Sequence, residues 1–405
     1  MADNTKAALF KYAGWLILAF SAVSVVLFFY QSINNFYKFN EIDFTSYVRA
    51  SQNFYNGNNP YLATPRRFSY PLFLAVILYP MTWLQSGHIM KGFSIGLWSL
   101  GAYVSFFAVI WAGWKKLEYD SGGTLLLKEG PLIAAVIVAL LHPFLQSEFI
   151  NGQINLYVMA AMAGYFFMLE SDRQFAASLF LAIGASIKIS PGICLLYVLF
   201  TQQYRTIGYF SALFLLFNFG LRLLVNHQSM DYYNYYGTVV LHDAAEHDFL
   251  AGWRSFSIIS TLSYLFKIHW NPAMKMTVIS GLAVLLALPV YFTACRHSSK
   301  LNSRIRITIF SGLIAIIPLS FPISEPHHLL ILTVPFIVIV HYWYQTYRAG
   351  GNPFKDYLSL LFLAVVAGLQ IGHGLKDVPL RLACLIALYI GLLQLVKKMR
   401  AEIII

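Results

Sequence analysis

Charged residues are scarce in this chain of 405 residues, and their scarcity excludes an ordinary soluble domain. They make up 11% of the sequence, whereas 58% of the residues are apolar and the mean hydropathy is +0.63. A soluble domain carries about 25% charged residues. The apolar residues fall in blocks of about 20, the length that crosses a bilayer core as a helix. Because these blocks lack the alternation of barrel strands, the sequence predicts an all-α integral membrane fold.

Cysteines and known catalytic motifs are also scarce. The three cysteines, Cys194, Cys295 and Cys384, lie in apolar segments at no metal-ligand spacing, so we interpret them as buried apolar side chains. The sequence has no Walker motif, dinucleotide fingerprint, zinc-protease motif or nucleophile elbow. This argues against an ATP-driven pump and against a nucleotide-sugar enzyme with a Rossmann-like domain. With no repeat or soluble module, we treat 1–405 as a single transmembrane domain.

Positive charges outnumber negative ones, and their distribution predicts the topology. The net charge is +11. The basic residues are scattered over short loops and form no dense stripe with stacking aromatics, which argues against a nucleic-acid partner. Basic short loops are typical of the cytoplasmic side, and they suit anionic lipid head groups. With the N-terminus inside, the inside loops receive more than half of the 28 basic residues: Lys6, Lys11, Lys115, Lys116, Lys128, Arg173, Arg205, Arg296, Lys300, Arg304, Arg306, Arg348, Lys355, Lys397, Lys398 and Arg400.

About twelve membrane spans are expected from the apolar blocks. The first, 10–30, is too long for the apolar region of a signal peptide and no small-residue cleavage site follows, so we interpret it as a retained span. The segments on either side of Lys188 are short, and they form either two spans or one broken helix. The later spans are expected near 90–112, 130–147, 153–170, 174–187, 190–202, 206–225, 274–294, 306–321, 329–345, 357–371 and 379–395.

Two long loops, 31–89 and 226–273, are expected on the extracytoplasmic side. In the first, 43–55 places its apolar residues near one face and predicts an amphipathic helix in the membrane interface. Asp43 is suited to cap the start of this helix, and Gly57 is suited to end it. The segment 70–84 is apolar but short and contains Pro71 and Pro80, so we expect an interfacial or re-entrant piece. The apolar segment 255–268 is also too short to span with certainty.

Polar and ionisable residues gather on this outer side, where such residues usually indicate a functional cavity. Asp43 has two interpretations that the sequence leaves open: a helix cap, or a general base that accepts a proton from an acceptor hydroxyl as a bond to a sugar forms. One base is sufficient when the leaving group is a phosphate, because a phosphate departs without a proton. Lys188 either extends toward the interface or contacts a phosphate and stabilises its developing charge.

Three further groups of residues also have both a structural and a functional interpretation. His327 and His328 are either partly buried rings of a polar loop or helix-start groups that help to hold an anion. Zinc is not expected there, because adjacent histidines on a helix point in different directions and no third ligand is apparent. Glu148, Asn151, Gln153 and Asn155 form either a turn with helix–helix hydrogen bonds or a set of partners for sugar hydroxyls. Weaker candidates for a phosphate contact are Arg66, Arg67, Arg222 and Arg254.

Five groups of motifs follow one another along the chain: Ile42-Asp43-Phe44 with Tyr47, Gly57 and Asn59-Pro60-Tyr61; Tyr70-Pro71-Leu72 and Tyr79-Pro80; Gly152-Gln153-Ile154-Asn155-Leu156; Lys188-Ile189-Ser190-Pro191; and Ser324-Glu325-Pro326-His327-His328. In this order they resemble glycosyltransferase family 87, membrane enzymes of the GT-C class that include mycobacterial mannosyl- and arabinosyltransferases using polyprenyl-phosphate sugars. The likeness covers about 43–328 and leaves out the chain beyond 350. One departure is Arg254, which precedes Ser255 where the family commonly has an Asn-x-Ser-Leu run.

The resemblance implies that Asp43 is the catalytic base, that one or both of His327 and His328 serve the active site, and that Lys188 and Gln153 line the cavity. The expected reaction is inverting transfer of a sugar, mannose first among the candidates, from a polyprenyl phosphate to a hydroxyl of a glycolipid or glycan. The expected place is the inner (plasma) membrane, with the site on the extracytoplasmic side. We expect no nucleotide and no obligatory metal, because protein cations are able to neutralise a single phosphate.

Two alternative functions fit parts of the sequence. A transporter or lipid flippase explains the many spans and the intramembrane charges. It does not explain the long polar first loop, and the paired broken helices of many transporters are not found. A polysaccharide polymerase or ligase with a pyrophosphate-linked donor is the second alternative. Membrane lipids, the donor and the acceptor are the partners that the sequence predicts.

Overall fold

The structure is a computed structural model, and it describes most of the chain. The described residues are 43–62, 68–119, 126–220, 229–240, 257–267, 271–295, 301–321, 326–375 and 377–404, with single positions between 19 and 30. The expected first span, 10–30, lies almost entirely outside this set. The four weaker candidates for a phosphate contact, Arg66, Arg67, Arg222 and Arg254, lie outside it as well.

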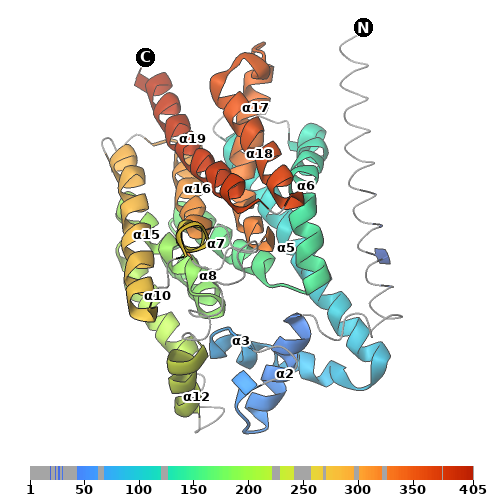
Figure 1. The fold of residues 1–405 in the computed structure, drawn as a ribbon. Coiled ribbons are helices and arrows are strands. Elements are labelled where there is room, and N and C mark those ends of the chain that lie inside the picture. The colour runs from blue at the N-terminus through green and yellow to red at the C-terminus, as the bar shows by residue number, and fades with distance from the viewer. Residues whose placement is uncertain are drawn as a thin grey trace.

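The described residues form helices and turns, and none of them lies in a strand. The long helices pack side by side in a bundle, with α2, α3 and α12 across one end (Figure 1). The first half contains α2 (Asp43–Tyr55), η2 (Pro60–Leu62), α3 (Leu72–Ile77), α4 (Tyr79–Thr82), η3 (Trp83–Gln85), α5 (Gly87–Tyr119), α6 (Leu126–Asn151), α7 (Asn155–Glu170), α8 (Gln174–Ile187), η4 (Ser190–Tyr197), α9 (Val198–Thr201), α10 (Arg205–Leu215) and η5 (Leu216–Gly220). The second half contains α12 (Ser229–Tyr235), η6 (Tyr236–Val240), α14 (Ile258–Phe266), α15 (Pro272–Cys295), α16 (Ser303–Ser320), η8 (Pro326–Leu332), α17 (Thr333–Arg348), η9 (Pro353–Lys355), α18 (Tyr357–Gly374) and α19 (Val378–Ile404).

Six helices within the described ranges are long and apolar enough to cross a membrane. They are Gly87–Glu118, Gly130–Asn151, Ser303–Ser320, His327–Arg348, Tyr357–Gly374 and Val378–Glu402. The protein is therefore a multi-pass, all-α membrane protein, as the sequence predicts. The expected count of about twelve spans is not confirmed. The segments 153–170, 174–187 and 190–202 are helical but fall short of 18 residues.

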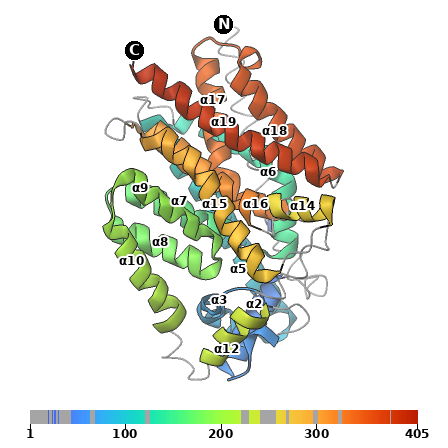
Figure 2. The ribbon, with the colours of Figure 1, turned by 60° about the vertical axis from the view of Figure 1, so that its left-hand side comes forward.

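The helix α16 forms the centre of the bundle, because its sequence is apolar on every side. All residues from Ile307 to Ser320 are buried. A helix that is apolar all round must be enclosed by other helices, and α15, α17 and α19 surround this one (Figures 1 and 2). Its start is defined by Asn302, whose side chain accepts a hydrogen bond from the backbone N–H of Ile305 at 3.0 Å.

The chain turns back on itself at Lys188, which separates α8 from η4. Lys188 has extended backbone, with φ −146° and ψ 126°. A Cβ atom on Gly184 would lie 3.6 Å from the Cβ atom of Pro191. Seven residues of continuous helix would separate these positions by about 10 Å. The segment 174–202 therefore forms two short helical pieces that pack against each other, and it is not one continuous helix.

The layer at the end of the bundle is built from the expected amphipathic segment and its neighbours. The predicted helix 43–55 is present as α2, with Phe44, Tyr47 and Phe54 buried. It ends at Tyr55, and Gly57 follows two residues later with φ +76°, a value that glycine adopts without strain. The segment 70–84 forms helices of at most six residues, too short to span, as expected. The hydroxyl of Tyr232 in α12 donates to the carbonyl of Gly57 at 2.8 Å and joins the second loop to the first.

At the opposite end of the bundle, polar contacts join α17, α18 and α19. Asp356 is the N-cap of α18, and its side chain accepts from the backbone N–H of Ser359 at 2.9 Å. The same carboxylate accepts from the hydroxyl of Tyr342 at 2.7 Å and from Nζ of Lys398 at 3.0 Å. Burial raises the pKa of Asp356, but the hydrogen bonds from Tyr342, Ser359 and Lys398 outweigh it and lower the pKa to about 2.

Replacing Asp356 by asparagine should lower stability in a pH-dependent way. Asparagine still caps the helix but loses the ion pair, which is worth about 1 kcal/mol or less for a partly exposed pair. Because the pKa is depressed in the folded state, the stabilisation is complete above pH 5. It is lost as the pH falls toward 2, with roughly half left at pH 3. Thermal unfolding of the detergent-solubilised protein at pH 7, 5 and 3 measures the difference between wild type and variant. A difference that does not narrow between pH 5 and pH 3 contradicts this account.

Candidate active site

Polar side chains from distant parts of the chain meet at the end of the bundle that α2 and α3 cover. They come from the start of α2, the turn between α6 and α7, the end of α8 and the start of η8. The helices α6 and α7 both pack against η8, and α3 packs against α8, which brings these segments together. The members are Asp43, Glu148, Gln153, Asn155, Lys188, His327 and His328, named the polar cluster below.

A tight reversal between α6 and α7 positions two amide side chains of the cluster. Gly152 adopts φ +60°, a backbone conformation that favours glycine. The backbone N–H of Gln153 donates to the carbonyl of Glu148 at 3.0 Å and closes the turn. The reversal sends Gln153 toward α2 and starts α7 at Asn155, next to the last turn of α6.

Glu148 is a carboxylate that is almost fully buried, with 1% of its surface exposed. Its Oε2 accepts from Nδ2 of Asn155 at 2.9 Å, and its Oε1 accepts from the backbone N–H of Leu156 at 3.1 Å. The N-terminal turn of a helix has unpaired N–H groups and a partial positive charge, and both favour an anion. Burying such a group without these partners would cost several kcal/mol. Glu148 therefore joins α6 to the first turn of α7.

Lys188 extends this network toward the histidines. Its Nζ donates to Oδ1 of Asn155 at 3.0 Å and lies 2.9 Å from Nε2 of His328. Since an ammonium group only donates, Nε2 of His328 accepts, and the ring carries its hydrogen on Nδ1. The rings of His327 and His328 are 4.6 Å apart between centroids and nearly perpendicular, at 83°. A carboxylate, an amide, an ammonium and an imidazole thus form one continuous chain of hydrogen bonds.

Asp43 joins the cluster through Gln153. Nε2 of Gln153 donates to Oδ2 of Asp43. The hydroxyl of Tyr70 donates to Oε1 of Gln153 at 3.5 Å, and the hydroxyl of Tyr47 donates to that of Tyr70 at 3.0 Å. The indole N–H of Trp98 donates to the backbone carbonyl of Gln153 at 3.3 Å. Asp43 is therefore the first residue of α2 and also a partner of the polar cluster.

Aromatic rings surround the pair formed by Asp43 and Gln153. Tyr47 packs edge-on against Tyr70 and Trp98, with centroids 5.0 and 6.1 Å apart, and Phe44 stacks on Trp98 at 5.0 Å. Burial raises the pKa of Tyr47 well above its usual value, and the nearby Tyr70 and Asp43 add to this effect. The phenol therefore stays protonated at neutral pH and donates a hydrogen bond.

The structure brings together most of the residues that the sequence singles out. Asn151 differs: its Nδ2 donates to the carbonyl of Ser147 in its own helix at 2.8 Å, so its amide is not part of the polar cluster. The sequence names Tyr47 and Tyr70 only among the motifs of the family resemblance and does not predict them, or Trp98, as members of the site. A hydroxyl on the buried face of an amphipathic helix is the signal that could have identified Tyr47. Within the described ranges, no group of three or more histidine, cysteine, aspartate or glutamate side chains has the arrangement of a metal site.

Replacing Glu148 by glutamine should destabilise the protein by about 1–3 kcal/mol, because the new amide places an N–H₂ group against a donor of Asn155 or Leu156. The effect is measured as the difference in free energy of unfolding in detergent micelles. Asn151→Ala is the matched control, since Asn151 bonds only within its own helix and should cost less than 1 kcal/mol. Equal stabilities of wild type and Glu148→Gln would show that the hydrogen bonds of Glu148 do not hold α6 to α7.

Two relatives in sequence have names that describe an activity. The chain is 25% identical over 269 residues to a polyprenol-phosphate-mannose-dependent alpha-(1-2)-phosphatidylinositol pentamannoside mannosyltransferase of Mycobacterium tuberculosis, covering 65% of this chain and 56% of that protein. It is 21% identical over 306 residues to a protein of the same name from Mycolicibacterium smegmatis, covering 74% of this chain and 68% of that protein. The match spans little more than half the length of the first relative.

Among solved structures, the chain is similar to the apo state of ArnT from Cupriavidus metallidurans. The TM-score is 0.45 at 13% identity, and the alignment covers 94% of this chain and 76% of that chain. The model of glycosyltransferase family 87 matches residues 68–322. Gln153, Asn155 and Lys188 lie inside this range, whereas Asp43 and the two histidines flank it. Because the match covers more than half of the sequence, the chain belongs to glycosyltransferase family 87.

Proposed function

We propose that the protein is an inverting glycosyltransferase that moves mannose from a polyprenyl phosphate to a hydroxyl group of an extracytoplasmic glycolipid or glycan. Membership of the family and the activity for which the two relatives are named support this reaction class. The observation that carries the proposal is the polar cluster itself. It contains the hydrogen bond between Asp43 and Gln153 and, on the same turn between α6 and α7, the hydrogen bonds that join Asn155, Lys188 and His328. The ring of His327 packs against that of His328.

Asp43 is the general base in this proposal. The acceptor oxygen attacks the anomeric carbon from the face opposite the phosphate, and its proton passes to the Asp43 carboxylate. The bond between the anomeric carbon and the phosphate oxygen breaks, and the polyprenyl phosphate leaves with its electron pair. The bond from Gln153 orients the carboxylate. A single base is sufficient, because the leaving phosphate needs no proton at neutral pH.

Lys188, His327 and His328 are the proposed contacts to the donor phosphate. Nζ of Lys188 donates to Asn155 and lies beside His328, so its positive charge is held within the polar cluster, where it would stabilise an anion that approaches. A fixed cation in a site of low dielectric constant stabilises the charge that develops on the phosphate as the bond breaks. Arg66, Arg67 and Arg254 are further proposed contacts to the donor phosphate.

The buried amides and aromatic rings suit recognition of the sugar. Gln153 and Asn155, together with Glu148, present donors and acceptors at one end of the bundle, and Tyr47 and Tyr70 add hydroxyl groups. Amide groups are suitable partners for sugar hydroxyls because they both donate and accept. Asn151 is the weakest member of the proposed set, since its amide bonds to its own helix.

The proposed placement has the polar cluster at the extracytoplasmic side of the inner membrane. The opposite end of the bundle carries the ends of α5, α17 and α19, with the basic residues Lys115, Lys116, Arg348, Lys398 and Arg400. Basic residues accumulate on the cytoplasmic side of membrane proteins. The donor would then reach the cluster from the outer leaflet.

Replacing Asp43 by asparagine should lower the rate of transfer at least 100-fold, because general-base catalysis contributes about 10²–10⁴-fold. The assay incubates the purified protein with radiolabelled polyprenyl-phosphate mannose and candidate acceptors and follows label into the product. Asp172→Asn is the matched control. Asp172 is exposed in the turn between α7 and α8 and has φ 57°, a conformation that asparagine also adopts. Transfer by Asp43→Asn at the wild-type rate would remove Asp43 from this role, and donor movement across vesicles without transfer would favour a flippase.

Chelators should leave the proposed transfer unchanged, because protein cations neutralise the single phosphate of the donor. The test compares initial rates before and after treatment with EDTA, with Mg²⁺ or Mn²⁺ added back. Loss of activity in EDTA with recovery on adding either ion would contradict the proposal and show a required metal.

A further inference from the structure

A second set of cations lies near the C-terminal end of α19. This end of the bundle is opposite the end that α2 and α3 cover (Figure 1). Here the C-terminal parts of α15 and α19 line an open cavity of about 660 Å³. The described residues that line it are Pro289, Phe292 and Thr293 from α15, and Leu393, Lys397 and Arg400 from α19. We propose that this cavity binds an anionic membrane phospholipid, with the phosphate at the two cations and an acyl chain along α15.

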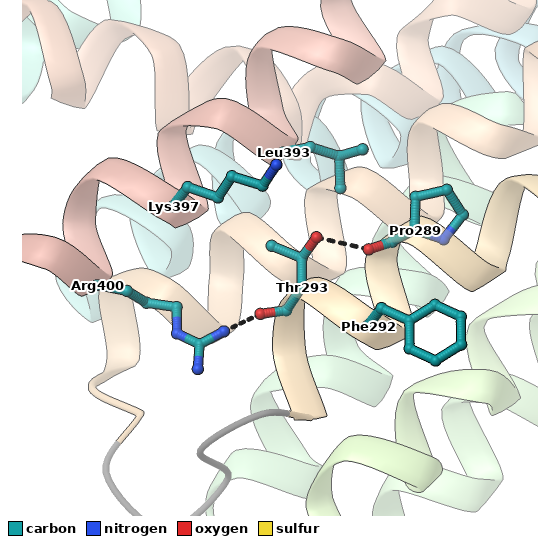
Figure 3. A pocket seen from close by; sticks show the side chains of 6 residues that line it. All are labelled: Pro289, Phe292, Thr293, Leu393, Lys397 and Arg400. Atoms are coloured by element: carbon teal, nitrogen blue, oxygen red, sulfur yellow. Dashed lines mark hydrogen bonds between the residues drawn. The ribbon is translucent and has the colours of Figure 1, made fainter.

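The spacing of the α19 residues puts both cations and an apolar side chain on one face. Positions 393, 397 and 400 follow the repeat of four and three residues that aligns side chains along a helix. Figure 3 shows Lys397 and Arg400 extending from α19, with Thr293 and Phe292 of α15 opposite. Leu393 lies one turn deeper than Lys397. The cavity is therefore apolar toward the bilayer core and cationic at its rim, the same polarity as a phospholipid.

The two cations differ in how they are held. A guanidinium N–H of Arg400 donates to the backbone carbonyl of Thr293, which fixes Arg400 across the gap between the helices. Lys397 has no hydrogen-bond or ion-pair partner among the described residues. Its neighbour Lys398 points elsewhere and pairs with Asp356 at 3.0 Å. One cation thus shapes the rim, and the other has its charge available for a ligand.

The positive charge of Lys397 and Arg400 in the cavity favours an anionic ligand. None of the six described residues that line the cavity is acidic. The hydroxyl of Thr293 donates to the carbonyl of Pro289 at 2.6 Å, so it does not supply a counter-charge. Basic pockets between membrane helices on the cytoplasmic side bind the head groups of anionic lipids.

The outer face of α15 explains why the ligand is a lipid and not a free anion. Its large apolar side chains are exposed in a continuous line: Val284, Leu285, Leu288 and Phe292 have 56%, 64%, 40% and 65% of their surface exposed. A helix face of this kind in a membrane protein contacts acyl chains. A second, shallower hollow of about 760 Å³ lies on the same helix at Thr277, Ser280, Gly281, Val284 and Leu285. The line connects this hollow to the cationic rim.

The test measures lipid binding to the purified, delipidated full-length protein by native mass spectrometry, with dioleoylphosphatidylglycerol and dioleoylphosphatidylcholine as probes. The anionic lipid should bind more tightly than the zwitterionic one. The double variant Lys397→Gln/Arg400→Gln should weaken the anionic lipid by about fivefold for each cation removed. The matched control is Lys115→Gln/Lys116→Gln, which removes two charges from α5 at the same end and should bind as wild type does.

A second variant and a second probe separate a lipid site from a phosphate site. Leu393→Trp fills the apolar part of the cavity and keeps both charges, so it should weaken phosphatidylglycerol as well. Inorganic phosphate at millimolar concentration should not compete. The proposal is overturned by equal binding of the two lipids, by unchanged binding in either the double variant or Leu393→Trp, or by full competition from inorganic phosphate.

Discussion

The buried hydrogen bonds of Glu148 are the interaction on which the rest of the polar cluster depends. In a bundle packed with apolar side chains, a carboxylate needs partners that water cannot supply. The first turn of α7 supplies them through Asn155 and the N–H of Leu156. This arrangement determines the position of the turn at Gly152, which aims Gln153 at Asp43. It also uses only part of the Asn155 amide, so the other part remains for Lys188.

The sequence predicted the elements in which local chemistry decides the structure. The apolar face of 43–55, the glycine after it and the two prolines of 70–84 specify short helices with buried faces, and the structure contains them. The number of spans was not predictable in the same way. An apolar segment of 14 residues fits a short span and a buried core helix equally well, so length and composition do not decide between them. The bundle places such segments beside α16 and against one another.

The polar cluster was predicted as a set of residues but not as a geometry. Asp43, Lys188 and the two histidines stood out because charged and polar groups are rare in this chain. Which amides of 151–155 belong to the cluster depends on the positive φ of Gly152, which turns Asn151 to its own helix and Gln153 to α2. The role of Trp98 could not be predicted from the sequence, because a tryptophan in an apolar helix has no sequence feature that identifies its hydrogen-bond partner.

The distance along the chain between Asp43 and His328 has a consequence for how the protein is made. Helices enter the membrane in the order of translation, and the first member of the cluster emerges more than 280 residues before the last. Until η8 is inserted, Lys188 lacks its imidazole neighbour, and α6 and α7 lack the segment that packs against both of them. A nascent chain that has not reached His328 therefore holds an incomplete cluster, and the described helices α17, α18 and α19 are added after the cluster is complete.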